Sequence, residues 1–218
     1  MSAEPTASQG LERAVHGWPA LLALLALGGA YALVSARFTL GPPWLMLALI
    51  VVGSIVGRGL HWRGLSREGH YAFLVVLVVL TVGVATSAAF LVQSLLTNRT
   101  EASDLLLSGA LLWASNVLVF SVWYWETDGG GPHIRAQSAY RSTDLAFPQK
   151  VVDAPEMAGW MPLYLDYLFL AFNTSTAFSP TDTMILSRRA KLLMMLQSVI
   201  SLTTIAVIAA RAINTLPS

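Results

Sequence analysis

The feature that most constrains this chain is a run of 26 consecutive residues, 71–96, without a charged side chain. A helix of about 20 apolar residues is long enough to cross the hydrocarbon core of a bilayer. Of all residues, 55% are hydrophobic and only 11% are charged, and the mean hydropathy is +0.62. A soluble domain carries about 25% charged residues. The composition therefore excludes a soluble enzyme and predicts an integral membrane protein.

Four further runs are apolar enough to form membrane-spanning helices, at residues 19–36, 44–57, 105–125 and 192–213. A Gly-Pro-Pro turn at Gly41 separates the first two of them. Gly53 and Gly57 have GxxxG spacing, which permits close approach of two helices, within the chain or between copies. The predicted fold is an all-α membrane protein with five spans. It divides into a polar segment over 1–18, three spans within 19–104 and a second module over 105–218.

The basic residues predict the orientation, because cytoplasmic loops of multi-pass proteins carry an excess of Lys and Arg. With five spans and a cytoplasmic N-terminus, ten of the 13 basic residues lie on the cytoplasmic side. The other three are Arg37, Arg99 and Arg211. We therefore expect a multi-pass protein of the cell inner membrane, with the polar stretch 127–162 in the cytoplasm.

Residues 163–178, LYLDYLFLAFNTSTAF, are apolar but too short to span, and they end in polar side chains. Pro162 stands where helices often begin, and Pro180 prevents a smooth continuation. Two interpretations fit this pattern. One is a re-entrant helix and loop over 163–182, followed by an inner helix over 190–214. The other is a helix that lies flat at the interface, with Asp166 among the headgroups. Non-helical backbone at membrane depth must be enclosed by protein or line water.

The register from Asp166 to Asp182 resembles the pore helix and filter of pore-loop potassium channels, which carry the motif T-x-T-T-V-G-Y-G-D. Without a gap, Thr174, Thr176 and Asp182 fall on its first Thr, second Thr and final Asp. The last span is similar to the inner helix of two-span potassium channels. The whole chain also looks like uncharacterised bacterial inner-membrane proteins with five spans. The channel resemblance implies a homo-oligomer, a tetramer, with residues 105–125 as the outer helix.

The same resemblance implies a narrow pore segment. Its members are Thr174, Ser175, Thr176, Ala177, Phe178, Ser179, Pro180, Thr181 and Asp182. Ser179 and Thr181 replace the filter glycines and Pro180 fixes its own φ, so a carbonyl ladder of the potassium type is not expected. Oxygen ligands and an acidic side chain favour monovalent cations, with weak selectivity. The alternative is a non-conducting membrane protein in which this segment packs as structure or docks a partner.

The remaining polar residues carry weaker signals. The acidic pair Glu126 and Asp128 either binds a cation or marks the membrane interface, and the interface is the favoured interpretation. A stripe of hydroxyls on the last span either lines a pore or seals helix contacts, and it comprises Ser198, Ser201, Thr203 and Thr204. The four His share no i, i+3 or i, i+4 spacing, cysteine is absent, and no catalytic motif is present. We therefore expect no enzyme activity, metal or cofactor. The apolar runs predict the lipid bilayer as a partner, and the net charge of +1 argues against nucleic acid, which requires a basic surface.

Overall fold

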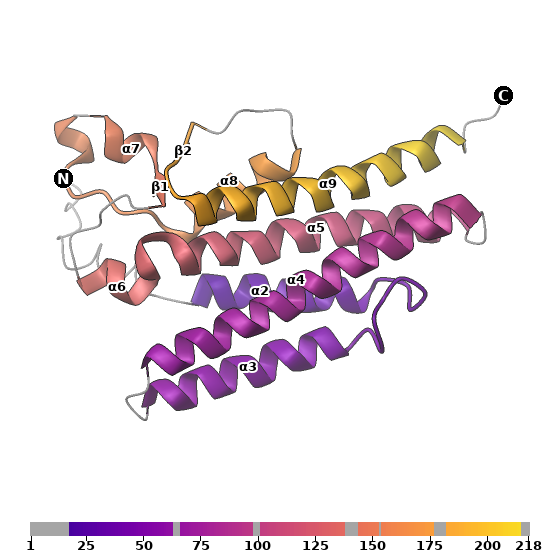
Figure 1. Ribbon diagram of the computed structural model, residues 1–218, viewed down its shortest axis with the longest axis horizontal. Coiled ribbons are helices and arrows are strands. Elements are labelled where there is room, and N and C mark those ends of the chain that lie inside the picture. The colour runs from indigo at the N-terminus through magenta and orange to yellow at the C-terminus, as the bar shows by residue number, and fades with distance from the viewer. Residues whose placement is uncertain are drawn as a thin grey trace, which may run out of the picture.

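The computed structural model describes residues 18–62, 66–97, 101–137, 144–152, 154–176 and 182–214. Its long helices lie side by side along one axis (Figure 1). They are α2 (Trp18–Ala32), α3 (Leu45–Trp62), α4 (Ser66–Thr97), α5 (Ala102–Thr127) and α9 (Arg188–Asn214). The shorter elements are η1 (Asp128–Gly130), α6 (Pro132–Gln137), α7 (Pro148–Val151), η2 (Pro155–Met157) and α8 (Tyr164–Thr176). Residues 1–17 of the predicted polar segment lie outside the described residues.

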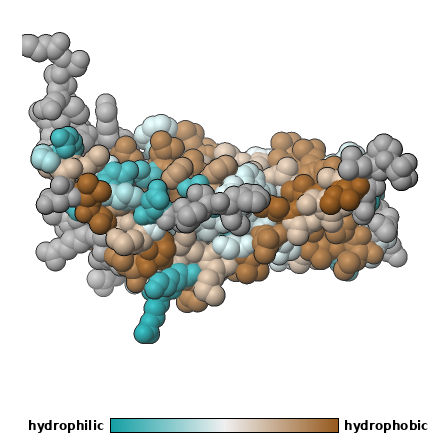
Figure 2. Space-filling model, turned by 90° about the horizontal axis from the view of Figure 1, so that it is seen from above, coloured by the Kyte–Doolittle hydropathy of each residue, from teal (hydrophilic) through white to brown (hydrophobic). Residues whose placement is uncertain are grey.

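Three of these helices, α4, α5 and α9, are long and apolar enough to cross a membrane. The apolar helices over Trp18–Ala32 and Leu45–Gly57 are shorter. A multi-pass helical membrane protein is therefore indicated, as the composition predicts. Figure 2 agrees with this, because hydrophobic side chains cover much of the length of the molecule and hydrophilic ones gather mainly toward one end.

The predicted first span, 19–36, is too long, because α2 ends at Ala32. Beyond that residue the backbone tightens, and the amides of Leu33 and Val34 each bond to the carbonyl three residues earlier. The next amide, that of Ser35, donates to Ser108 Oγ on α5 at 3.3 Å. The helix therefore stops where the chain binds its neighbour, a contact that hydropathy does not reveal.

Helix α5 lies at the centre of the bundle and contacts α2, α4, α8 and α9. Small residues allow the close contacts: a Cβ built on Gly109 of α5 would lie 2.7 Å from Ile208 Cγ1 of α9. Likewise, a Cβ on Gly53 of α3 would lie 2.7 Å from Val76 Cγ2 of α4. The first glycine of the GxxxG pair therefore serves a contact within the chain.

One feature departs from the all-α prediction. Two short strands, β1 (Leu145–Ala146) and β2 (Met184–Ile185), pair antiparallel, with Leu145 opposite Ile185 and Ala146 opposite Met184. A two-residue strand is too short to show an alternating pattern in the sequence, so the ladder was not predictable. It joins the polar stretch after α5 to the segment that precedes α9.

The Gly109 contact yields a test of the packing between α5 and α9. Gly109→Ala is expected to lower the free energy of unfolding by about 1–3 kcal/mol, because the β-branched Ile208 has little room to move. Gly29→Ala is the matched control, since a Cβ there meets nothing within 4 Å. Thermal unfolding in detergent measures both variants. Equal stability of the two variants would contradict the close contact.

Candidate functional site

Helix α8 packs against the C-terminal half of α5 and runs in the opposite direction. At its first residue, the Tyr164 hydroxyl lies 2.6 Å from Ser121 Oγ. Near its last turn, the Phe172 ring meets the Trp113 ring edge-on, with the centroids 5.8 Å apart. Trp113 lies near the middle of α5, so α8 stops about halfway along the bundle (Figure 1).

After α8 the chain returns to the end of the bundle from which it came. Strand β2 pairs with β1, and the amide of Leu186 donates to the carbonyl of Asp144 at 2.8 Å. The carboxylate of Asp144 accepts a hydrogen bond from Gly129 N, directly after α5, at 3.2 Å. The start of α8 and the segment before α9 therefore both lie at the C-terminal end of α5.

The last turn of α8 meets a group of buried polar side chains, which we call the half-depth cluster. Gln197 of α9 is its centre. Gln197 Nε2 donates to the carbonyl of Ala171 and to Ser175 Oγ, each at 2.7 Å, and its Oε1 accepts from the Tyr124 hydroxyl at 2.5 Å. All polar atoms of this buried side chain thus have partners, and they join α5, α8 and α9. The cluster comprises Asn116, Tyr124, Ser175, Gln197 and Ser201.

Two further bonds complete the half-depth cluster. Asn116 Nδ2 donates to the backbone carbonyl of Gln197 at 3.2 Å, and Ser201 Oγ donates to the carbonyl of Ser175 at 2.5 Å. Backbone carbonyls at a helix end need such partners when water is excluded. The hydroxyl of Ser201 is therefore engaged between helices. Thr204 is also buried and bonds to the carbonyl of Ile200 within its own helix.

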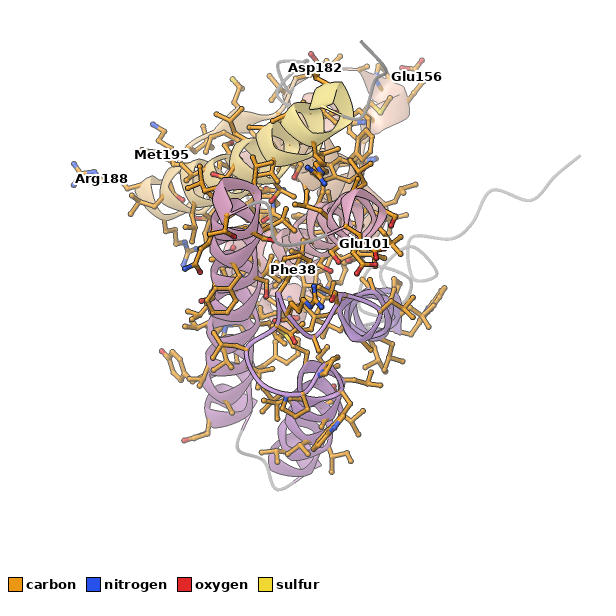
Figure 3. All side chains as sticks on the ribbon, turned by 90° about the vertical axis from the view of Figure 1, so that its right-hand side faces the viewer. Phe38, Glu101, Glu156, Asp182, Arg188 and Met195 are labelled. Atoms are coloured by element: carbon orange, nitrogen blue, oxygen red, sulfur yellow. The ribbon has the colours of Figure 1, made fainter. Side chains whose placement is uncertain are left out.

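The structure separates the predicted pore residues. The Thr174 hydroxyl is buried and donates to Leu170 O at 2.8 Å, and Ser175 belongs to the half-depth cluster. The half-buried Thr176 bonds to the carbonyl of Asn173 at 3.0 Å. Asp182 is exposed, two residues before β2, and lies at the outer edge of the molecule (Figure 3). The predicted pore residues Ala177, Phe178, Ser179, Pro180 and Thr181 lie outside the described residues.

A second group of polar side chains, the end cluster, lies where α5 ends. Asp128 is fully buried, and its carboxylate accepts from the amide of Leu145 at 3.3 Å and from the Tyr167 hydroxyl at 2.7 Å. Arg135 is 3% exposed, and its Nη1 donates to the carbonyls of Trp125 and Asp128. Its guanidinium lies over the rings of Trp125 and Tyr167, at 4.7 and 5.2 Å from their centroids. The members are Asp128, Arg135, Asp144, Tyr167 and Arg189.

An ion pair in the end cluster joins Asp144 to Arg189, the second residue of α9. Arg189 Nε donates to Asp144 Oδ1 at 2.6 Å, and its Nη2 bonds to the same carboxylate and to the carbonyl of Thr127 at the end of α5. Burial raises the pKa of Asp144, but the hydrogen bonds from Arg189 and Ser187 and the charge of Arg189 outweigh it and hold the pKa below its ordinary value. The pair therefore carries both charges at neutral pH.

Asp128, interpreted from the sequence as an interface marker, is fully buried and bonded to β1 and α8, so its carboxylate is engaged within the protein. Glu126 does lie near the bundle end, with Oε2 3.4 Å from His70 Nδ1. Gln197 was not identified at all. A single amide within an otherwise apolar helix was the available signal, because such a residue is costly in lipid unless it faces the bundle interior. Within the described ranges, no three His, Asp or Glu side chains are placed to hold a metal ion.

Comparison with known proteins adds no relative: no family model matches the chain, and no curated protein or solved structure does. The resemblance of residues 166–182 to pore-loop channels therefore rests on those residues themselves.

The half-depth cluster yields a prediction for stability. Gln197→Leu keeps the approximate volume but leaves the Tyr124 hydroxyl and two acceptors of α8 without their partner. We expect a loss of about 1–3 kcal/mol in the free energy of unfolding, the cost of leaving buried polar groups unsatisfied. Gln93→Leu is the matched control, because this glutamine is exposed on α4. Thermal unfolding in detergent measures both. An equal effect of the two substitutions would contradict the role of Gln197.

Proposed function

We propose that this chain is a five-span membrane protein that conducts monovalent cations with weak selectivity, and that α8 and the residues after it re-enter the membrane. In this proposal α2 and α3 span together with α4, α5 and α9. The N-terminus is cytoplasmic, which puts the end cluster on the cytoplasmic side of the cell inner membrane. The working unit is a homo-oligomer, a tetramer by the resemblance to pore-loop channels.

The observation that carries the proposal is the end of α8 halfway along α5, against the half-depth cluster. Polar side chains at membrane depth are costly, and they commonly mark the path of an ion or substrate. Discontinuous helices that stop near the bilayer midplane mark such sites in transporters as well. The exposed apolar side chains of α9, among them Leu192, Val199 and Leu202, suit contact with lipid.

The preference for cations rests on two features. The C-terminal end of α8 carries the negative end of its helix dipole, and that end lies at half depth. Asp182 is exposed near the bundle end, where a ring of such carboxylates would raise the local concentration of cations. In this proposal Thr174 and Ser175 hold α8 in place, the narrow part begins at Thr176, and Asp182 lies at its mouth.

A specific observation favours the second candidate, a non-conducting membrane protein. All three hydroxyls at the start of the predicted pore segment, those of Thr174, Ser175 and Thr176, are bonded inside one subunit. The same contacts are expected of a helix that only packs within the subunit and lines no pore. Flux measurements separate the two candidates.

Purified protein in liposomes is expected to pass monovalent cations and exclude anions. Asp182→Asn should reduce the cation flux several-fold, because it removes the charge at the mouth. Glu68→Gln is the matched control, since Glu68 is an exposed acid in the first turn of α4, and it should leave the flux unchanged. The oligomeric state is measured on the same preparation by native mass spectrometry. A monomer without flux under any ionic gradient would rule out the conduit and leave the structural role.

A further inference from the structure

Four buried polar atoms along the seam between α5 and α8 have no hydrogen-bond partner among the described residues. Two are at half depth, Trp113 Nε1 and Asn116 Oδ1, and two are at the bundle end, Trp125 Nε1 and Arg135 Nη2. A buried polar group without a partner is expensive, and more so where lipid excludes bulk water. Native proteins therefore leave few such groups unsatisfied, and each one requires an explanation.

The contacts of these side chains place them on the α8 side of α5. The Trp113 ring meets Phe172, and the Trp125 ring meets Tyr164 and Tyr167 edge-on, with the centroids 5.9 and 5.5 Å away. The guanidinium of Arg135 lies over the Trp125 ring.

Asn116 follows Trp113 by three residues, so the two side chains are neighbours on one face of α5. The amide nitrogen of Asn116 is already committed to the carbonyl of Gln197, so its Oδ1 is the acceptor that remains. The fully buried Asn116 therefore presents an acceptor about one helical turn from Trp113, on the same face of α5.

The chemistry of the four atoms selects the ligand. A cation satisfies only the oxygen of Asn116, and an anion satisfies only the donors of Trp113, Trp125 and Arg135. Water both donates and accepts, and a buried water typically makes about three hydrogen bonds to otherwise unsatisfied groups. Water can therefore form a hydrogen bond with each of the four atoms.

We propose that the seam between α5 and α8 holds internal water at two places. At half depth, water donates to Asn116 Oδ1 and accepts from Trp113 Nε1. At the bundle end, water accepts from Trp125 Nε1 and Arg135 Nη2. These sites lie within one subunit and do not depend on the proposed conduction or on an oligomer. They place water at the bundle end and, separately, at the level of the half-depth cluster.

Radiolytic hydroxyl-radical footprinting of the full chain in nanodiscs tests the proposal, because radicals formed from bound water oxidise the side chains beside it. Trp123 is the internal control: it lies on the same helix, is half-buried like Trp113, and its Nε1 donates to Thr81 Oγ1 at 2.9 Å. We expect Trp113 and Trp125 to be oxidised several-fold faster than Trp123. Oxidation of both indoles at or below the rate of Trp123 would overturn the proposal, and this comparison needs no variant.

Asn116→Leu provides the second measurement, since leucine is close in size but offers no acceptor. We expect oxidation of Trp113 to slow several-fold, with no rise in the melting temperature. Ser115→Ala is the matched control, because this buried hydroxyl bonds to Leu111 O within its own helix, and it should leave the rate unchanged. An unchanged rate at Trp113 in Asn116→Leu, or a higher melting temperature, would show that the half-depth oxygen is dry and overturn the water site there.

Discussion

The bonds of the Gln197 side chain are the interaction on which the rest of this structure depends. One amide group joins the Tyr124 hydroxyl of α5 to the Ala171 carbonyl and the Ser175 hydroxyl of α8. A helix of 13 residues is too short to cross a bilayer, and in the proposed re-entrant position its last backbone groups need partners other than lipid. Gln197 and Ser201 supply partners for the last turn of α8 from α9, a helix that is long and apolar enough to cross a membrane. The position of α8 is therefore determined by polar contacts as well as by apolar packing.

The end cluster has a complementary role at the opposite end of α8. Buried charges are tolerated when they are paired and hydrogen-bonded. Asp128 meets the first turns of α8 through Tyr167, while Asp144 binds Arg189 at the start of α9. The β1–β2 ladder adds a backbone connection between the same segments. The start of α8 and the segment that leads into α9 are therefore held at the same end of the bundle, while the half-depth cluster holds the last turn of α8.

The apolar runs were enough to predict the long helices, because length and hydropathy are local properties. Pro162 and the polar residues after Phe172 also bracketed α8 closely. Contacts between distant segments were not predictable in this way. The sequence favours an interface marker at Asp128 and does not predict its partners, because Tyr167 and Leu145 lie far from it along the chain. The early end of α2 was likewise not predictable, because Ser35 bonds to Ser108, which lies 73 residues away in the sequence.

The central claim is that α8 ends near the middle of the membrane, and the depth of Thr176 tests it most directly. The chain contains no cysteine, so single spin labels at Thr176→Cys and Leu163→Cys can be compared in nanodiscs by power saturation with oxygen and a water-soluble nickel complex. The account predicts a label near the bilayer centre at Thr176 and one at headgroup level at Leu163. Equal headgroup depths for the two labels would contradict it and indicate a helix that lies flat on the membrane.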